Sequence, residues 1–125
     1  MAKLLICDDE PHIRLLLEEA LEDLEDEGIE LLFAEDGEEA MEIILRESPR
    51  MVLLDIMMPK RNGFDVCWEI KKTRALPDVF VVMLTAKGQE VDKQRGKECG
   101  ADRYMTKPFA PTEVVALARD VLGLA

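Results

Sequence analysis

The sequence predicts an α/β domain built on a parallel β-sheet with helices on both faces. Two observations support this fold class. Short apolar runs, each long enough for one strand, alternate with longer segments whose apolar residues recur at helical spacing. The 125 residues, of which 48% are apolar and 34% charged, have ordinary globular composition. Their number suits one domain over residues 1–125 that buries its own core.

The first half of the chain contains two strand–helix pairs. Lys3–Cys7 is the first strand, and the apolar residues that follow it recur at helical spacing until Gly28. Ile29–Ala34 is the second strand, and Asp36–Gly37 is a turn. The second helix is expected to stop at Ser48–Pro49, because the residue before a proline disfavours helical geometry.

The third strand begins at Met51 and carries a single carboxylate, Asp55, before Pro59 stops the apolar run. Continuous apolar runs are typical of strands covered on both faces, although periodicity alone does not distinguish them from buried helix segments. We therefore expect Asp55 at the carboxyl end of a strand. Ligands bind at this edge of open parallel sheets.

The second half repeats the alternation. The expected elements are a helix from Phe64 that ends before Pro77, a strand at Asp78–Leu84, a helix at Gly88–Cys99, a strand at Ala101–Met105 and a closing helix through Val114 and Leu122. Five strands thus alternate with five helices. Right-handed crossovers then give a doubly wound, flavodoxin-like (βα)5 sheet with strand order 2-1-3-4-5.

Charge and cysteine content exclude several classes of protein. A formal net charge of -11 argues against direct binding of nucleic acid or an anionic membrane. The first apolar run meets acidic residues too soon for a signal peptide or membrane span, so we expect a cytoplasmic protein. Cys7, Cys67 and Cys99 match neither a disulfide framework nor a zinc site, and reduced, buried thiols are expected.

Polar residues follow the expected strands at one edge of the sheet: Asp8 and Asp9 after the first, Asp55 after the third, Thr85 after the fourth and Lys107 after the fifth. Any one acid could simply cap the next helix. Three clustered carboxylates, however, repel one another unless a cation such as Mg²⁺ or Mn²⁺ neutralises them. With Thr85 and Lys107 they describe a phosphoryl site in which Asp55 is the nucleophile and an aspartyl phosphate the product.

The motifs that carry these residues are Cys7–Glu10, Leu54–Pro59 with Gly63, Leu84–Ala86 and Gly100–Phe109. Through them the sequence resembles, over essentially its whole length, the receiver (CheY-like) domain of response regulators in two-component signalling. The resemblance implies that Asp55 accepts a phosphoryl group from a phosphohistidine on a sensor histidine kinase or a histidine phosphotransfer protein. It implies a switch rather than a multiple-turnover enzyme.

The resemblance also implies a metal site and an output. Asp9, Asp55 and the main-chain carbonyl of Met57 would bind Mg²⁺ directly, whereas Asp8 would act mainly through water. Pro108 after Lys107 resembles the family's cis-proline turn. The chain would be a stand-alone receiver that controls an output partner, or the amino-terminal part of a longer regulator that controls an effector domain.

Three further expectations concern the activated state. Thr85 and Tyr104 would form a switch that remodels the face made by the fourth helix, fifth strand and fifth helix. Met57 and Lys87, two residues after Asp55 and Thr85, would obstruct the water that hydrolyses the phosphate.

The third is a phosphorylation-dependent homodimer through that face, because Thr85–Phe109 most resembles the winged-helix transcription-factor class. Lys93 and Glu113 could form an intermolecular ion pair. The class pattern is incomplete, because Arg103 replaces a usual acid and Leu117 a usual arginine.

Two other functions fit less well. A hydrolase of the haloacid dehalogenase type also uses a strand-terminal aspartate and Mg²⁺, but it needs a second acid where this chain has Met57. A flavodoxin binds the FMN phosphate in a loop after the first strand that is rich in Ser, Thr and Gly. Here Asp8-Asp9-Glu10 would repel that phosphate.

Overall fold

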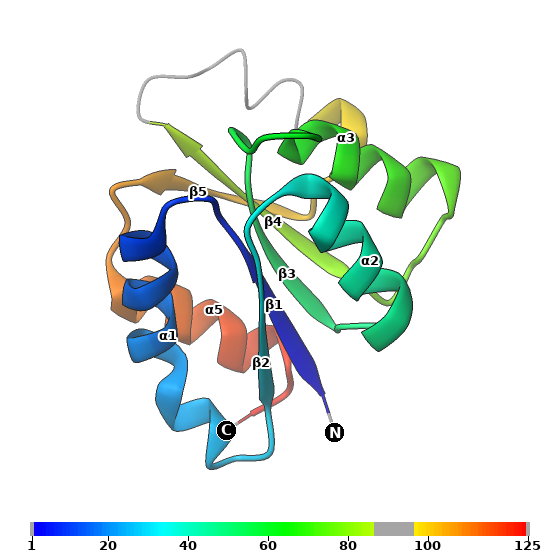
Figure 1. Ribbon diagram of the computed structural model, residues 1–125. Helices are drawn as coiled ribbons and strands as arrows, with labels where there is room; N and C mark the ends of the chain where they lie inside the picture. Colours follow the sequence, from blue (N-terminus) through cyan, green and yellow to red (C-terminus); the bar gives the residue numbers. More distant parts are fainter. Residues whose placement is uncertain (1, 87–96, 125) are drawn as a thin grey trace.

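The computed structural model describes residues 2–86 and 97–124 of the chain. Its five strands form one parallel sheet in the order β2-β1-β3-β4-β5 (Figure 1), which confirms the predicted fold class and strand order. The strands are β1 (Lys3–Cys7), β2 (Glu30–Ala34), β3 (Met51–Asp55), β4 (Phe80–Ala86) and β5 (Arg103–Lys107). The central strand β3 is buried over its whole length, as its continuous apolar run predicts.

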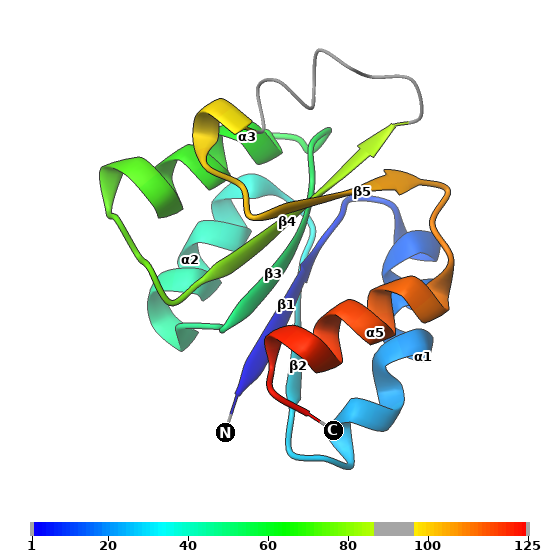
Figure 2. The same ribbon diagram turned by 180° about the vertical axis from the view of Figure 1, so that it is seen from behind.

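Helices cover both faces of the sheet (Figures 1 and 2). α1 (Pro11–Glu25) and α5 (Pro111–Val121) lie side by side on one face, whereas α2 (Gly37–Glu47) and α3 (Gly63–Trp68) cover the other. A π-helical segment, Glu69–Thr73, continues α3. Most of the helix predicted at residues 88–99 lies outside the described residues, and Lys97–Cys99 is its described helical part.

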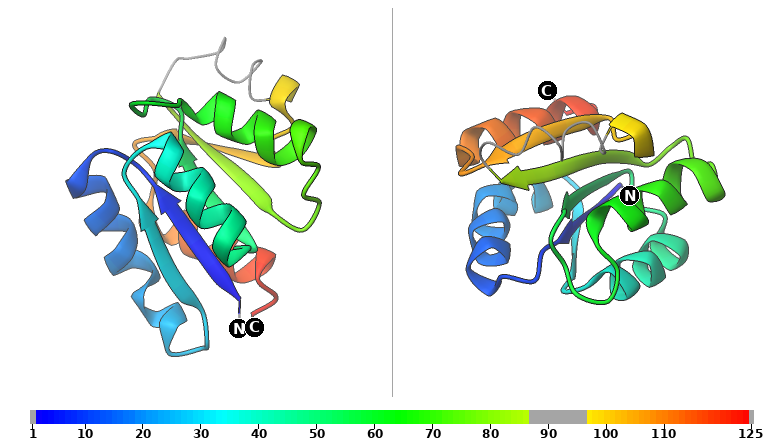
Figure 3. Two further views of the ribbon diagram at one scale, coloured as in Figure 1. Left: turned by 45° about the vertical axis from the view of Figure 1, so that its right-hand side comes forward. Right: turned by 90° about the horizontal axis from the view of Figure 1, so that it is seen from above.

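Alternation along the strands divides the core into two layers. Leu5, Val52 and Met83 point toward α2 and α3, whereas Ile6 and Leu53 point toward α1 and α5. Figure 3 shows these two layers of helices with the sheet between them. Both sets of side chains are buried, so the helices are fixed on the sheet and the loops at its carboxyl edge start from rigid positions.

Two strands begin and end about two residues later than the sequence predicts. β4 was expected at residues 78–84 and β5 at residues 101–105. Pro77 and Asp78 instead form a turn, and Asp102 lies just before β5 with its backbone N–H bonded to the carbonyl of Val81. An apolar pattern does not show where a strand ends when the residues beyond the apolar run can also adopt strand geometry. Thr85 and Lys107 consequently lie inside their strands, not after them.

Local side-chain caps fix two of the helices beside the carboxyl edge. Asp36 accepts a hydrogen bond from the backbone N–H of Glu39 at 2.8 Å, so the predicted Asp36–Gly37 turn is the start of α2. Asn62 caps α3 in the same way, at 3.0 Å from the N–H of Asp65. None of the described helices is both long enough and apolar enough to span a bilayer.

Candidate functional site

Acidic side chains gather where β1 and β3 end. Asp8 and Asp55 are buried, with exposed fractions of 0% and 4%, whereas Asp9 and Glu10 are exposed. Each of these four residues offers one carboxylate oxygen, and these oxygens all lie within 4.8 Å of one another. The sequence predicted Asp8, Asp9 and Asp55 for this site. Glu10 was named only as part of a motif, although its place directly after the aspartates was the available signal.

Lys107, the last residue of β5, connects the two buried acids. Its Nζ lies 2.9 Å from Oδ2 of Asp8, 3.3 Å from Oδ1 of Asp55 and 3.9 Å from Oε1 of Glu10. Burial alone would lower the pKa of Lys107, but the hydrogen bond to Asp8 and the charge of Asp55 outweigh it and raise that pKa. The ammonium group therefore stays charged. The peptide bond from Lys107 to Pro108 is cis, as expected.

The negative charge of Asp55 is only partly compensated by Lys107. Oδ1 of Asp55 has two long contacts with donors, 3.4 Å from the backbone N–H of Met57 and 3.3 Å from Nζ of Lys107. Burial, and secondarily the charge of Asp8, raise the pKa of Asp55 from 3.8 to about 6, although Lys107 opposes the shift. A second cation at this site would favour the ionised carboxylate.

Asp8 differs from Asp55 because both of its oxygens are engaged. Oδ1 accepts the backbone N–H of Glu10 at 2.9 Å, and Oδ2 accepts Lys107. The main-chain carbonyl of Asp8 also accepts a hydrogen bond from Arg14. These contacts explain why a buried carboxylate is tolerated here.

The loop after β3 is held tightly against the strand by Gly63. A Cβ at Gly63 would lie 2.4 Å from the carbonyl oxygen of Asp55, so a larger residue would push the loop away. The N–H of Gly63 donates to the carbonyl of Ile56 at 2.8 Å. Met57 lies in this loop with its side chain directed to solvent, since the residue is 75% exposed.

Thr85 and Tyr104 are oriented away from the carboxylates. The buried Thr85 hydroxyl lies 3.5 Å from the main-chain carbonyl of Met105, to which it donates. Tyr104 is half-buried and packs against the core layer beneath α2 and α3. Its hydroxyl is buried and has no hydrogen-bond partner among the described residues, and burial raises its pKa. The Tyr104 hydroxyl is therefore already buried in the unphosphorylated protein.

Two residues of the sequence-based expectations, Lys87 and Lys93, lie outside the described residues. Glu113, the expected partner of Lys93, is exposed in the first turn of α5.

The four clustered acids have the chemistry of a site for a divalent metal ion. Clustered carboxylate oxygens are the ligands that Mg²⁺ and Mn²⁺ prefer, so the residues fit such an ion.

Comparison with known proteins gives a consistent result. The sequence model of the response regulator receiver domain family matches residues 4–119. A protein of Porphyra purpurea described as probable transcriptional regulator ycf27 is 46% identical over 123 residues, which are 98% of this chain and 48% of that protein. The chain thus spans about half the length of the curated relatives that it matches.

Solved structures agree with this match. A putative response regulator from Chloroflexus aurantiacus has a TM-score of 0.86 and 32% identity, with 98% of both chains covered. The response regulator DrrB of Thermotoga maritima, described as an OmpR/PhoB homolog, has a TM-score of 0.84 and 32% identity. There the match covers 98% of this chain and 53% of the other.

Proposed function

Because the chain belongs to the response regulator receiver domain family, we propose that it is a phosphorylation-dependent switch whose phosphoacceptor is Asp55. The observation that carries the proposal is the bridge from Lys107 to Asp8 and Asp55, beside the exposed Asp9. A nucleophilic carboxylate, a fixed cation and a free acid occupy one edge of the sheet. This is what transfer of a phosphoryl group requires.

In the proposed reaction, a carboxylate oxygen of Asp55 attacks phosphorus while the bond from phosphorus to the donor's imidazole nitrogen breaks. Lys107 pairs with the phosphoryl oxygens, and the Thr85 hydroxyl donates to one of them. Asp9, Asp55 and the main-chain carbonyl of Met57 would hold Mg²⁺ directly, with Asp8 contributing through water. When bound, the ion would neutralise charge on the same oxygens.

The proposed partners follow from this role. The donor is the phosphohistidine of a sensor histidine kinase or a histidine phosphotransfer protein, and the product state acts on an output protein or domain. Relatives named as transcriptional regulators are about twice as long as this chain, which supports an output domain of that kind. The net charge of -11 argues against direct contact of these 125 residues with nucleic acid.

Incubation of the metal-free protein with acetyl phosphate and Mg²⁺ tests the function. Intact mass spectrometry is expected to show addition of one phosphoryl group, because the site has one nucleophile next to a fixed cation. A parallel sample with EDTA controls for metal-independent labelling. Absence of labelling with Mg²⁺, or labelling undiminished by EDTA, would contradict the proposal.

The switch predicts movement at Tyr104. Once the Thr85 hydroxyl donates to the phosphoryl group it leaves the carbonyl of Met105, and the space beside β5 changes shape. Tyr104 is the single tyrosine of the chain, so its aromatic NMR signals are unambiguous. We expect beryllofluoride with Mg²⁺ to shift them in the native protein but not in Thr85→Val, which keeps the shape and loses the hydroxyl. Unchanged signals in the native protein would count against the switch.

The lifetime of the phosphorylated state is predicted to be long for a receiver. The exposed Met57 thioether cannot orient water as an amide or carboxylate would, and we propose that Lys87 lies across the same approach. The double variant Met57→Asn with Lys87→Glu is expected to lose phosphate faster once the donor is removed. Equal or slower loss would show that these positions do not set the lifetime.

Activation is also predicted to produce a homodimer through the face of β5 and α5. Arg103, Glu113 and Leu117 line a hollow of about 310 Å³ there. Exposed ion pairs contribute only about 0 to 1 kcal/mol each, so a pair between Lys93 and Glu113 would support a weak dimer. Sedimentation with and without beryllofluoride, with Glu113→Gln as the matched variant, decides this. A monomer in both states would overturn it.

A further inference from the structure

Two cysteines that are 32 positions apart in the sequence lie next to each other in the core layer beneath α2 and α3. Cys67 lies on α3 and Cys99 at the end of the helical turn Lys97–Cys99, and both are reduced and buried. The Cys67 thiol donates to the main-chain carbonyl of Cys99 at 3.6 Å. The two side chains are also close enough to influence each other's ionisation. They belong to the same layer of the core as the ring of Tyr104.

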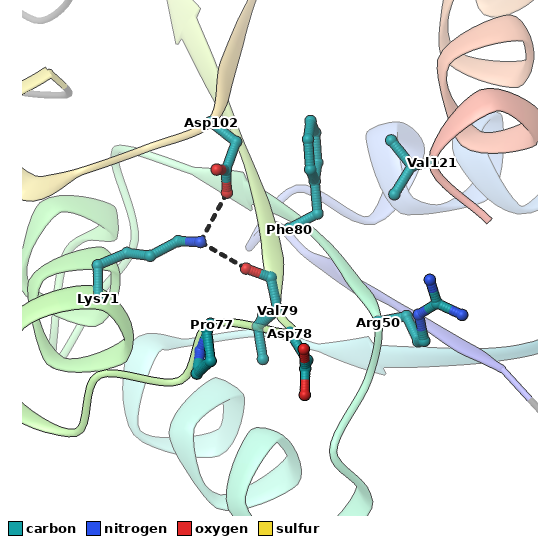
Figure 4. A pocket seen from close by; sticks show the side chains of 8 residues that line it. All are labelled: Arg50, Lys71, Pro77, Asp78, Val79, Phe80, Asp102 and Val121. Atoms are coloured by element: carbon teal, nitrogen blue, oxygen red, sulfur yellow. Dashed lines mark hydrogen bonds and ion pairs between the residues drawn. The ribbon is translucent and has the colours of Figure 1, made fainter. Parts of the chain in front are cut away.

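The segments that carry the two cysteines are fixed to each other next to this contact. Lys71, four residues after Cys67, places its Nζ 2.7 Å from Asp102 and 2.6 Å from the carbonyl of Val79. Asp102, three residues after Cys99, also accepts the backbone N–H of Val81 at 2.8 Å. Figure 4 shows this ion pair at the edge of a pocket of about 490 Å³.

The backbone between Cys99 and Asp102 also closely approaches the π-helical segment that continues α3. Gly100 has a φ of +88°, and a Cβ there would lie 3.2 Å from the Cβ of Lys71. A glycine allows this turn and this approach together. The contacts of Gly100 and Asp102, which follow Cys99 in the chain, therefore hold this segment beside the helix that carries Cys67.

We propose that Cys67 and Cys99 are a redox pair that closes to an intramolecular disulfide under peroxide and ties α3 to the segment that enters β5. The Cys67 sulfur already contacts the main chain of Cys99, so a local rearrangement of the two side chains is enough to form a bond of about 2.05 Å. The inference goes beyond the proposed phosphoryl transfer and does not depend on it.

The chemistry proceeds in two balanced steps. The Cys99 thiolate attacks one peroxide oxygen, the O–O bond breaks, and hydroxide leaves and takes up a proton to give water and a sulfenic acid at Cys99. The Cys67 sulfur then attacks the Cys99 sulfur, and water leaves with the Cys67 proton. Each sulfur has lost one electron, and the peroxide has been reduced to water by both.

The order of attack follows from the electrostatics of the pair. The neighbouring Cys67 side chain lowers the pKa of Cys99, with help from backbone N–H groups and Lys72, whereas the Cys99 side chain and burial raise the pKa of Cys67. Cys7, the third cysteine, is buried in β1, and burial and nearby carboxylates raise its pKa well above the usual value. Cys7 is therefore a matched control within the chain.

The test treats the reduced, folded full chain with hydrogen peroxide, then denatures it and alkylates the remaining thiols for mass spectrometry. We expect a monomer that has lost two alkylatable thiols, a cross-linked peptide joining Cys67 and Cys99, and full recovery after reduction. Cys7→Ala is expected to behave in the same way. Cys67→Ala and Cys99→Ala are expected to form no intramolecular cross-link.

Circular dichroism establishes that each variant is folded, and Cys67→Ser provides a second replacement where alanine unfolds the chain. Three results would overturn the proposal: three alkylatable thiols after treatment of the native protein, a cross-link that includes Cys7, or a disulfide found only between two chains. The test needs neither phosphodonor nor metal. Its failure and that of the proposed phosphorylation are therefore distinguishable.

Discussion

Asp55→Asn is expected to incorporate no phosphate from acetyl phosphate and Mg²⁺ under conditions in which the native protein takes up one group. The amide is nearly the same shape as the carboxylate, so it can still accept from Met57 and lie beside Lys107. It lacks the anionic oxygen that attacks phosphorus. Intact mass measured over time quantifies the loss, which should leave incorporation at the level of the sample without donor.

Asp65→Asn is the matched control for this variant, because Asp65 is an exposed aspartate on α3, near the site in sequence but outside it. We expect its labelling to equal that of the native protein. Labelling that persists in Asp55→Asn would identify a different phosphoacceptor. That result would remove the basis of the proposed function without contradicting the fold.

Asp55→Asn is also expected to stabilise the metal-free protein. In the folded state the pKa of Asp55 is raised from 3.8 to about 6 by burial and by Asp8. The native protein therefore holds a proton that the unfolded chain releases in this window, and its stability falls as pH rises through it. A pKa shift of this size lowers the free energy of unfolding by about 1–3 kcal/mol at neutral pH. Asp55→Asn should restore this stability.

Urea unfolding at several pH values, with and without Mg²⁺, measures this effect. The gain from Asp55→Asn is expected to be largest above pH 6, to fade toward pH 4 and to shrink when Mg²⁺ neutralises the native carboxylates. Asp23→Asn, which removes one exposed charge on α1, should show no such pH dependence. A variant that is less stable than the native protein at neutral pH would show that the interaction of Asp55 with Lys107 outweighs its repulsion from Asp8.

Much of the fold could be predicted because local patterns in this chain agree with the tertiary structure. The apolar run from Met51 to Asp55 is buried on both faces, and such a run, stopped by a proline after a few residues, is typical of a central strand. Alternation of strands and helices then restricts the connections to right-handed crossovers, which leaves few strand orders. The carboxyl edge of the sheet follows from that topology, and with it the meeting of Asp8, Asp9, Asp55 and Lys107.

The sequence by itself determined the fold class, the strand order and the identity of the acidic site, whereas contacts between distant segments decided the rest. The ends of β4 and β5 depend on pairing such as that of Asp102 with Val81. The inward hydroxyl of Tyr104 and the contact of Cys67 with Cys99 depend on how α3 packs against the segment before β5. Periodicity reports which face of an element is buried, but it does not specify which buried side chains touch. That choice is made when the layers close into a densely packed core.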